Sequence, residues 1–511
     1  MHSPNDQIDR ARQYHDRTAH SPRSIRESRH TLDWNIKPSP FKIYPTLPAL
    51  PLPRDFPAAT ADTFASLSGS VRTGSPLDIE RLAALLFYSA GITRARTYPG
   101  GDQIFFRAAP STGALYQTEV YVVAGDVSGL PAGVYHFGPG DFALRALRAG
   151  DFRGAVAWAA GDDRMATAPA VAVLTAIYWR NTWKYQSRGY RHLFWDAGAM
   201  LANLLAAATA LGLPARVVTG FVDAEVDALL GLDAAKEGAL AVVPIGADAR
   251  PATPPPPLLP VSAEIVPLSS AEVQYPLLVE ARLDSSLDSE AAVLEWRERR
   301  IAARPAAPTG PVSPLPAPRA ESGRSLGETL QARGSTREFS GAAISAEELS
   351  SALHHATRGI DGDVQSGLVD LYLTVHAVGG IAPGAYRYDR RGHGLELIKP
   401  GDFRSESAFL CLEQPLGGMS SATVFFLSDL SRLLGALGNR GYRVANLEAG
   451  IVGGRLYVAA YAQRFGATGL TFYDRSVVEF FAPPAADLDA MFVTALGRSV
   501  KATPRTAASW R

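Results

Sequence analysis

Lys184 and Tyr185 stand side by side in the aromatic segment YWRNTWKYQSRGYRH, residues 178–192. A lysine whose pKa is lowered by desolvation and by nearby cations can take a proton from carbon, and a tyrosine hydroxyl can orient the substrate or relay that proton. The nearby cations would be Arg180, Arg188 and Arg191. The alternative is a helix edge on which the lysine reaches into water and the tyrosine packs into the core.

A second group of polar side chains alternates along RGSTREFSG, where Arg333, Ser335 and Arg337 occupy every other position. In an extended segment such residues point to one side. Two guanidinium groups and a hydroxyl on one side match the oxygens of a phosphate group. We therefore predict a phosphate-binding segment, against the alternative of a solvated loop with two surface arginines.

A third feature is a tight turn in the stretch FRAAPSTGALYQTEVYVV, directly ahead of an alternating strand. The turn consists of Pro110, Ser111, Thr112 and Gly113. Its backbone N–H groups, hydroxyls and glycine could approach a planar ring system closely. Such a turn is common by itself, so its meaning depends on what lies beside it.

The elements that must position these residues occur twice in the chain. GVYHFGPGDFALRALRAGDFR, residues 133–153, returns as GAYRYDRRGHGLELIKPGDFR, residues 384–404. RGYRHLFWDAG, residues 188–198, returns as RGYRVANLEAG, residues 440–450. Matches in the same order indicate a duplicated domain, and two copies in one chain can pack like the subunits of a two-fold dimer.

Each copy is predicted to run from a helix through strands to a long helix and a last strand, which is an α+β arrangement. The first helices are SPLDIERLAALLFYSAGI, with Ser75 as N-cap, and ISAEELSSALHHATRGI, with a capping box from Ser345 to Glu348. Proline-rich stretches favour extended chain that forms no core. The predicted parts are a Pro-rich arm at 1–59, a first domain at 60–250, a Pro-rich linker at 251–324 and a second domain at 325–511.

The two copies differ in a complementary way. The second copy has the arginine–serine segment and the first lacks it, whereas the first copy has the Pro–Ser turn and the second lacks it. The Lys184–Tyr185 pair corresponds to Ala436–Leu437 in the second copy. This pattern predicts one composite site at the interface, to which each copy contributes a different part.

Together these motifs resemble the nitroreductase fold and, more narrowly, the SagB/ThcOx-type azoline dehydrogenases, here as two tandem nitroreductase-like domains in an intrachain pseudo-dimer. The resemblance implies one FMN between the domains. The residues implied to bind it are Arg333, Ser335, Arg337, Arg498 and Lys501 at the phosphate, Gly469, Leu470 and Thr471 near flavin N5, and Pro110, Ser111, Thr112, Gly113 and Arg107 beside the isoalloxazine. It also implies that Lys184 and Tyr185 are the counterparts of the family's Lys–Tyr motif, which is associated with proton abstraction.

By this resemblance the chain is expected to oxidise thiazoline or oxazoline rings to azoles in a ribosomally made peptide. It would work beside a cyclodehydratase that makes the ring, with dioxygen reoxidising the flavin. One alternative is an NAD(P)H-dependent reductase of nitro compounds, quinones or enones, which needs no Lys–Tyr base. Another is a scaffold without flavin that binds a leader peptide or a modification enzyme through its proline-rich segments.

Composition limits the other classes of function. The 511 residues carry 50 basic and 50 acidic side chains, so no net charge favours nucleic acid or an anionic membrane surface. The single cysteine, Cys411, excludes an internal disulfide and is expected to be a core thiol. The polar N-terminus lacks the apolar core of a signal peptide. We therefore expect a cytoplasmic protein, either a monomeric pseudo-dimer or a higher oligomer.

Several other polar side chains are expected to be structural. His354 and His355 face different sides of a helix and have no third ligand at metal spacing, so no metal site is predicted. Asp196 and Glu448 occupy matching positions in the two long helices and are expected to cap or pin those helices.

Overall fold

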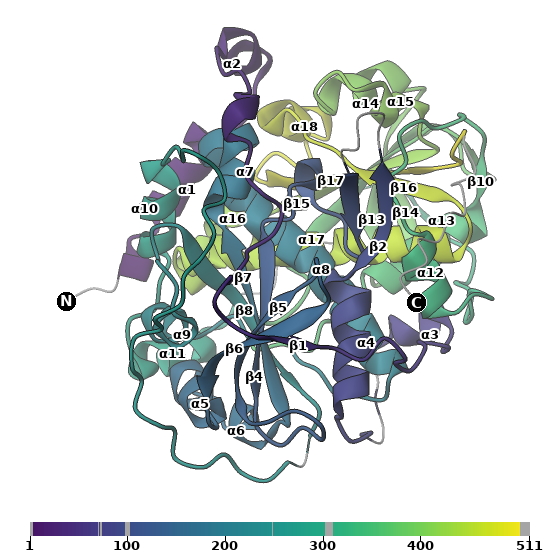
Figure 1. Cartoon of the computed structure of the whole chain (residues 1–511). Helices are drawn as coiled ribbons and strands as arrows, with labels where there is room; N and C mark the ends of the chain where they lie inside the picture. Colours follow the sequence, from purple (N-terminus) through teal and green to yellow (C-terminus); the bar gives the residue numbers. More distant parts are fainter. Residues whose placement is uncertain are drawn as a thin grey trace.

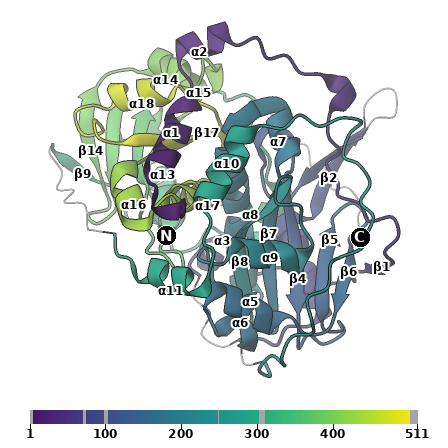
Figure 2. The ribbon, with the colours of Figure 1, turned by 90° about the vertical axis from the view of Figure 1, so that its left-hand side faces the viewer.

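The computed structural model describes residues 4–69, 71, 74–97, 103–247, 249–301 and 310–500. Each half of the chain contains one large antiparallel sheet, and two long helices pass between the halves (Figure 1). The view in Figure 2 separates the halves, with the first half in blue and the second in green and yellow. Sheets and helices are mixed in both halves, which confirms the predicted α+β pseudo-dimer.

The two large sheets repeat one strand order. The first has the order β1-β6-β5-β4-β7-β8, and the second has the order β9-β14-β13-β11-β15-β17, with β16 added beyond β17. The first sheet consists of β1 (Ala49–Pro51), β4 (Thr118–Ala124), β5 (Gly133–Gly138), β6 (Ala143–Ala149), β7 (Ala170–Ile177) and β8 (Glu237–Ile245). The second consists of β9 (Val312–Pro314), β11 (Asp370–Val375), β13 (Gly384–Asp389), β14 (Gly394–Pro400), β15 (Ala422–Ser428), β16 (Gly466–Gly469) and β17 (Asp489–Gly497). Two small pairs complete the strands, β2 (Ile92–Thr97) with β3 (Gln103–Arg107) and β10 (Ile344–Ser345) with β12 (Val378–Gly379).

The helices also correspond between the halves. The first half has α3 (Thr63–Ser66), α4 (Ile79–Ala90), α5 (Arg153–Ala160), α6 (Arg164–Thr167), α7 (Tyr178–Tyr185), α8 (Gly189–Ala210) and α9 (Asp223–Leu230). The second half has α12 (Leu326–Ala332), α13 (Ala346–Ala356), α14 (Arg404–Leu410), α15 (Pro415–Met419), α16 (Leu430–Leu437), α17 (Arg440–Ala462) and α18 (Asp474–Phe480). Short 3₁₀ turns are η1 (Pro4–Asp6), η2 (Trp34–Ile36), η3 (Thr112–Ala114) and η4 (Gln186–Arg188).

The N-terminus predicted for the first helix of each copy is confirmed in the second copy and wrong in the first. The capping box of α13 is confirmed, since the Glu348 amide donates to Ser345 Oγ and the Ser345 amide donates to Glu348 Oε2. The prediction of Ser75 as N-cap is wrong, because α4 begins at Ile79 and Asp78 accepts the Arg81 amide at 2.8 Å. Asp78 stands directly before the apolar run, where a carboxylate satisfies the orphan amides best.

The long helices α8 and α17 cross where the repeated motifs place glycines. A Cβ atom on Gly198 would lie 2.4 Å from the Leu447 carbonyl oxygen, and one on Gly450 would lie 2.4 Å from the Trp195 carbonyl oxygen. The backbones can therefore approach only because both residues are glycine. This crossing joins the halves and sets the spacing of everything built on the two helices.

The cores explain the apolar composition of the central segments. All residues of β4, β7 and β8 are buried, because α8 packs against these strands and Lys42 of the arm contacts Tyr121 and Glu237 of the sheet. Residues Tyr178–Ala210, which form α7, η4 and α8, are long and apolar enough to cross a membrane, but 89% of their most apolar window is buried inside the protein. Cys411 is buried in the second core, as predicted.

The proline-rich arm and linker contain more regular structure than their composition predicts. The arm includes α1 (Asp9–Arg17) and α2 (Pro22–Glu27), and β1 pairs with β6. The linker includes α10 (Pro276–Asp284) and α11 (Glu290–Glu298). The prediction of an extended linker is therefore wrong for residues 276–298, where apolar residues such as Leu278 and Trp296 are buried.

Candidate active site between the two halves

The Pro110–Gly113 turn is fixed by a carboxylate on the long helix of its own half. Asp196 of α8 accepts hydrogen bonds from Ser111 Oγ at 2.5 Å, from Thr112 Oγ1 at 2.7 Å and from the Thr112 amide at 2.9 Å. Gln117 Nε2 donates to the same carboxylate at 2.6 Å. Asp196 was expected to pin its helix, but it pins the turn instead.

Glu448 does the matching work in the second half. Its carboxylate on α17 accepts the amides of Gly367, Leu368 and Val369, which precede β11 as the turn precedes β4. Burial raises the pKa of Asp196 to about 6 against the opposing effect of these hydrogen bonds, and burial also raises the pKa of Glu448. In both halves the long helix therefore holds the loop that faces the other half.

The Lys184–Tyr185 pair lies beside the turn. Gly113 has φ +63°, and a Cβ atom on it would lie 2.9 Å from the Tyr185 hydroxyl oxygen. Tyr185 is half-buried and Lys184 is exposed at the end of α7. Burial raises the pKa of Tyr185, and the nearby Asp196 raises it further. The turn and the pair thus form one surface in the first half.

Arg337 of the second half reaches this surface. Partial desolvation of the ammonium group lowers the pKa of Lys184, and repulsion from Arg337 lowers it further. The same guanidinium lies near enough to Tyr185 to oppose the rise in its pKa. Residues from the two halves are therefore brought together at the predicted interface, and the cation that acts on Lys184 comes from the other half.

The three arginines predicted to act on Lys184 have other partners. Arg180 is fully buried and forms an ion pair with Glu119. Arg188 and Arg191 both bind the Asp474 carboxylate of α18, at 2.9 and 2.5 Å. That expectation is wrong, because a neighbour in sequence on a helix need not face the same side.

The arginine–serine segment joins the two halves at one end of the site. Arg333 is buried, and its Nε and an Nη atom donate to the carbonyl oxygens of Ala108 and Arg107, at 2.7 and 2.8 Å. Ser335 Oγ lies 3.3 Å from the Tyr457 hydroxyl of α17. Arg337 is exposed and has no acidic partner among the described residues. Of the two guanidinium groups, Arg337 is therefore the one free to meet a phosphate.

The backbone amides of the loop after β16 differ in whether they already have an acceptor within the protein. The Gly469 amide donates to the Tyr457 hydroxyl, and the Leu470 amide donates to the Val493 carbonyl at 3.2 Å. Within the described part of the chain, the Thr471 amide donates to no protein acceptor. Thr471 thus offers the open donor of the three predicted residues.

The remaining predicted phosphate and ring residues are either used within the fold or lie outside the described part of the chain. Arg107 is buried and donates to the carbonyl oxygens of Pro40 and Thr118, which ties the arm to β4. Arg498 donates to both carboxylate oxygens of Glu348 at 2.7 Å. Lys501 lies outside the described residues.

Two polar residues beneath Tyr185 were not singled out from the sequence. His192 packs edge-on against the Tyr185 ring at a centroid distance of 4.5 Å, and its Nδ1 lies 3.0 Å from Asn181 Oδ1. At the matching positions the second half has Leu433 and Val444. The signal was present in the repeat, since this polar pair occurs only in the copy that has Lys–Tyr.

Arg94 of β2 is a further cation that the sequence did not reveal. It lies near Arg333 and lowers the pKa of that group, although burial lowers it more. A Cβ atom on Gly334 would lie 3.9 Å from an Nη atom of Arg94. The first half therefore adds positive charge to the segment that carries Arg337.

The donor set fits a flavin mononucleotide. Arg337 and the Ser335 hydroxyl suit a phosphate group, while the open Thr471 amide suits a ring acceptor. A glycine beside the Tyr185 hydroxyl leaves room for close approach of a planar ring, which a Cβ atom would reduce. Among the described residues, no cluster of His, Cys, Asp and Glu could hold a metal ion.

Comparison with known proteins assigns the family. A sequence profile of the Nitroreductase family matches residues 76–247. A protein of Methanocaldococcus jannaschii that is named a nitroreductase is 33% identical over 173 residues, which cover 34% of this chain and 82% of that protein. This chain belongs to the nitroreductase family. The family match lies in the half that contains the Pro–Ser turn and Lys184–Tyr185.

Two further proteins are similar to parts of this chain. The microcin B17-processing protein McbC of Escherichia coli is 31% identical over 133 residues, and the trifolitoxin-processing protein TfxB of Rhizobium leguminosarum is 30% identical over 181 residues. The matched parts cover 25% and 32% of this chain but only 49% and 46% of those two proteins.

A solved structure matches both halves at once. The crystal structure of a protein from Anabaena variabilis, also named a nitroreductase, superposes with a TM-score of 0.78 at 27% identity. The superposition covers 96% of this chain and 99% of that one. The arrangement of the two halves is therefore shared with another nitroreductase-family chain.

Proposed function

We propose that this chain is an FMN-dependent dehydrogenase that oxidises azoline rings, thiazolines or oxazolines, to azoles in a ribosomally made peptide. The observation that carries the proposal is the approach of Arg337 from the second half to Lys184 and Tyr185 of the first. The segment proposed to bind phosphate and the candidate base thus lie at one interface. That arrangement suits a cofactor held between the two halves.

Both halves would hold the cofactor. Arg337 and Ser335 would bind the phosphate, with Arg94 and Arg333 adding positive charge. The Thr471 amide would donate to the ring from one side, and the turn fixed by Asp196 would pack against it from the other. FMN, when bound, supplies the acceptor for two electrons.

Lys184 would take the proton. Oxidation of an azoline to an azole removes two hydrogens from neighbouring ring atoms, one as a proton and one with its electron pair. A neutral amine at Lys184 can accept the proton, and its lowered pKa increases the neutral fraction near pH 7. Tyr185, with its raised pKa, keeps its own proton and can orient the ring through its hydroxyl.

The peptide substrate is supported by the relatives. McbC and TfxB are named for the processing of microcin B17 and trifolitoxin. A chain that acts on such a peptide would work beside the cyclodehydratase that forms the ring, in the cytoplasm where the peptide is made. The SagB-type class, suggested by the sequence motifs, has the same substrate chemistry.

The direct test is oxidation of an azoline-containing peptide by the purified, flavin-loaded chain. Lys184→Ala should lower the rate of azole formation by about 10²–10⁴-fold while flavin stays bound. Lys236→Ala is the matched control, because Lys236 is an exposed lysine of the same half that pairs with Glu272. Equal rates for the two variants would contradict the proposal.

A second candidate function is NAD(P)H-dependent reduction of nitro compounds, quinones or enones. It is favoured by two similar proteins that are named nitroreductases. That reaction requires no protein base at Lys184. Rapid NAD(P)H-driven turnover that Lys184→Ala leaves unchanged, together with no azole formation, would favour this candidate over the dehydrogenase.

A further inference from the structure

The repeat creates a second interface position in which the two halves exchange roles. There, Leu437 at the end of α16 stands where Tyr185 stands in the first position. The loop before β11, which contains Gly362 and Asp363, stands where the Pro110–Gly113 turn stands. This second position is where another cofactor would lie if the two halves were equal.

The backbone donors of the second position can be identified from the strand register. Ala215 bridges Ile245 in the first half as Ala467 pairs with Leu496 in the second. Three residues further on, the Val218 amide donates to the Val242 carbonyl as the Leu470 amide donates to the Val493 carbonyl, so Thr219 corresponds to Thr471. The Thr219 amide is thus the counterpart of the open Thr471 amide, and the Gly220 amide follows it.

Asp363 already occupies these donors. Its carboxylate accepts the Gly220 amide at 2.6 Å, the Thr219 amide at 2.9 Å and Thr219 Oγ1 at 2.9 Å. A carboxylate so held both fills the place of a ring acceptor and brings a negative charge. The first position has no such carboxylate on Thr471 among the described residues.

The linker helix α11 adds an aromatic side chain at the same place. The Trp296 indole is 1% exposed, and its Nε1 donates to the Leu437 carbonyl at 2.8 Å. A Cβ atom on Gly220 would lie 2.8 Å from the indole ring. Arg297 follows and donates to the carbonyls of Gly161 and Gly220, at 2.7 and 3.2 Å. The linker therefore covers the loop that would face a cofactor.

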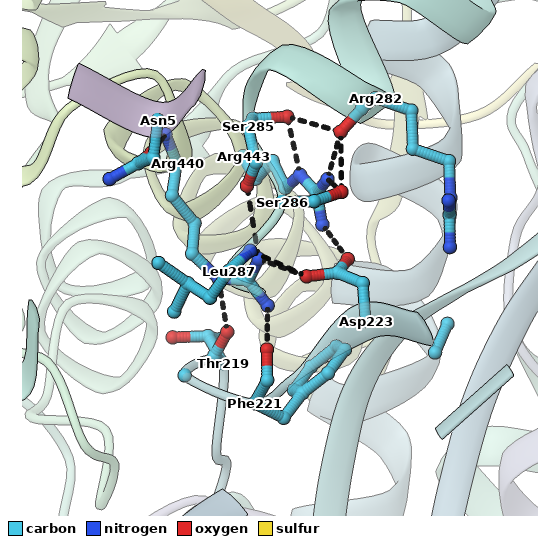
Figure 3. Close-up of polar contacts among 12 residues, drawn as sticks. Asn5, Thr219, Phe221, Asp223, Arg282, Ser285, Ser286, Leu287, Arg440 and Arg443 are labelled. Atoms are coloured by element: carbon cyan, nitrogen blue, oxygen red, sulfur yellow. Dashed lines mark hydrogen bonds and ion pairs between the residues drawn. The ribbon is translucent and has the colours of Figure 1, made fainter. Parts of the chain in front are cut away.

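A buried ion-pair network fixes the linker in this place. Figure 3 shows Asp223 between Arg440 and Arg443, each at 2.6 Å, while the Leu287 amide donates to the same carboxylate at 3.1 Å. Arg440 also donates to the Ser285 carbonyl at 3.0 Å. Residues 285–287 lead directly into α11, so the network determines where Trp296 lies.

The first position has the same ion-pair network, but the segment that the network holds there runs in a different direction. Asp474 binds Arg188 and Arg191 and accepts the His20 amide at 2.7 Å, as Asp223 does for its arginines and Leu287. The chain leads from there into α2, which contains no buried residue and projects from the body at the top of Figure 1. The arm thus leaves the donor loop of the first position uncovered, whereas the linker covers the corresponding loop of the second position.

We propose that Asp363 and Trp296 permanently occupy the second cofactor position, so that one chain binds one flavin. This inference rests on the proposed function. A cavity of about 540 Å³ remains beside the occupant, lined by Arg216, Arg297, Arg299 and Arg300 among other residues. Exclusion of a second flavin therefore depends on the donors that Asp363 occupies and on the place that the indole takes, and not on the absence of a cavity.

The first test counts flavin on the full chain after saturation with FMN and gel filtration. One flavin per chain is expected, and two would overturn the inference. The double variant S335A/R337A should then lose the flavin. If it keeps one flavin per chain, the flavin sits in the second position and the inference fails.

The second test needs no cofactor. Hydrogen exchange at the Thr219 and Gly220 amides should be slow in the unaltered chain and at least about tenfold faster in Asp363→Ala. Asp361→Ala is the matched control, because its side chain is 73% exposed beside Arg216, and it should leave both amides protected. Fast exchange in the unaltered chain would overturn the inference. A chain with protected amides and no flavin would instead overturn the proposed function.

Discussion

Arg337 and Lys184 are 153 positions apart in the sequence, yet the guanidinium of one lowers the pKa of the other across the interface. Desolvation of the lysine has the larger effect, and the repulsion adds to it. Both effects favour the neutral amine. The interface itself therefore favours the neutral amine that the proposed proton transfer needs, because neither half alone contains both charges.

The pH dependence of turnover should report this repulsion. The rate should rise with pH as Lys184 loses its proton. It should reach its plateau at a lower pH than a lysine of ordinary pKa, about 10.5, would give. With FMN saturating, Arg337→Gln should move the rise to higher pH, because a positive neighbour is removed. Arg337→Lys keeps the charge and should move it far less. A rise at the same pH in Arg337→Gln would contradict the predicted coupling.

Asp196 should affect both the turn and the pH dependence of stability. Asp196→Ala leaves the Thr112 amide without its acceptor, so we expect a loss of about 2 kcal/mol in the free energy of unfolding and weaker FMN binding. Denaturant unfolding and flavin titration measure these two effects. Unchanged FMN affinity would show that the turn does not face the ring.

The sign of the pH effect follows from the raised pKa of Asp196. The native chain keeps this proton up to about pH 6, whereas the unfolded chain loses it near 3.8. The native state thus binds more protons between these values, and the contribution of Asp196 to stability falls as pH rises from about 4 to 6. Asp196→Asn does not titrate and should remove that part of the slope. An identical slope in both chains would show that Asp196 is ionised throughout.

The pair His192–Asn181 should support Tyr185 without stabilising the fold. In the double variant N181L/H192V, which installs the residues of the second half, unfolding free energy should change by less than about 1 kcal/mol, since both polar partners are replaced together. H192V alone leaves Asn181 buried without a partner and should cost about 1–3 kcal/mol. Turnover in the double variant should fall about tenfold, because the ring of Tyr185 loses the neighbour that orients it.

A double-mutant cycle separates these outcomes. Coupling of the two substitutions in stability, together with lost turnover and retained flavin, would establish His192 as a positioning residue. Full turnover in the double variant would show that His192 is a core histidine without a role in positioning Tyr185.

Packing at the helix crossing should be intolerant of a single methyl group. Gly198→Ala or Gly450→Ala places Cβ 2.4 Å from a carbonyl oxygen of the other long helix and should cost at least about 1–3 kcal/mol in unfolding free energy. Gly435→Ala is the matched control, since a Cβ atom there meets nothing within 4 Å in α16. It should stabilise the chain by about 0.5–1 kcal/mol. Thermal and denaturant unfolding measure the contrast.

The sequence predicts well what the repeat encodes locally. The matching glycines, the succession of helix, strands and long helix, and the duplication itself follow from motifs that stand in register in both copies. The complementary losses also indicate that both halves contribute to one interface. The approach of Arg337 to Lys184 is the kind of contact that this pattern predicts.

Long-range electrostatics and docked segments could not be predicted in the same way. Arg188 and Arg191 pair with Asp474, nearly 300 residues away, and nothing in the sequence around the two arginines indicates that partner. Proline content suggested an extended linker, but burial of Trp296 against the second half stabilises a helix there. Which of several polar residues face the site depends on such tertiary contacts, as the pairing of Arg498 with Glu348 also shows.

A crystal structure of the chain saturated with FMN tests the central claim most directly. The account predicts one flavin between the halves, with its phosphate on Arg337 and Ser335, its ring against the turn at Ser111, and Lys184 at the edge where a substrate would lie. A flavin that contacts residues of only one half, or the absence of flavin from the interface at saturating concentration, would contradict it.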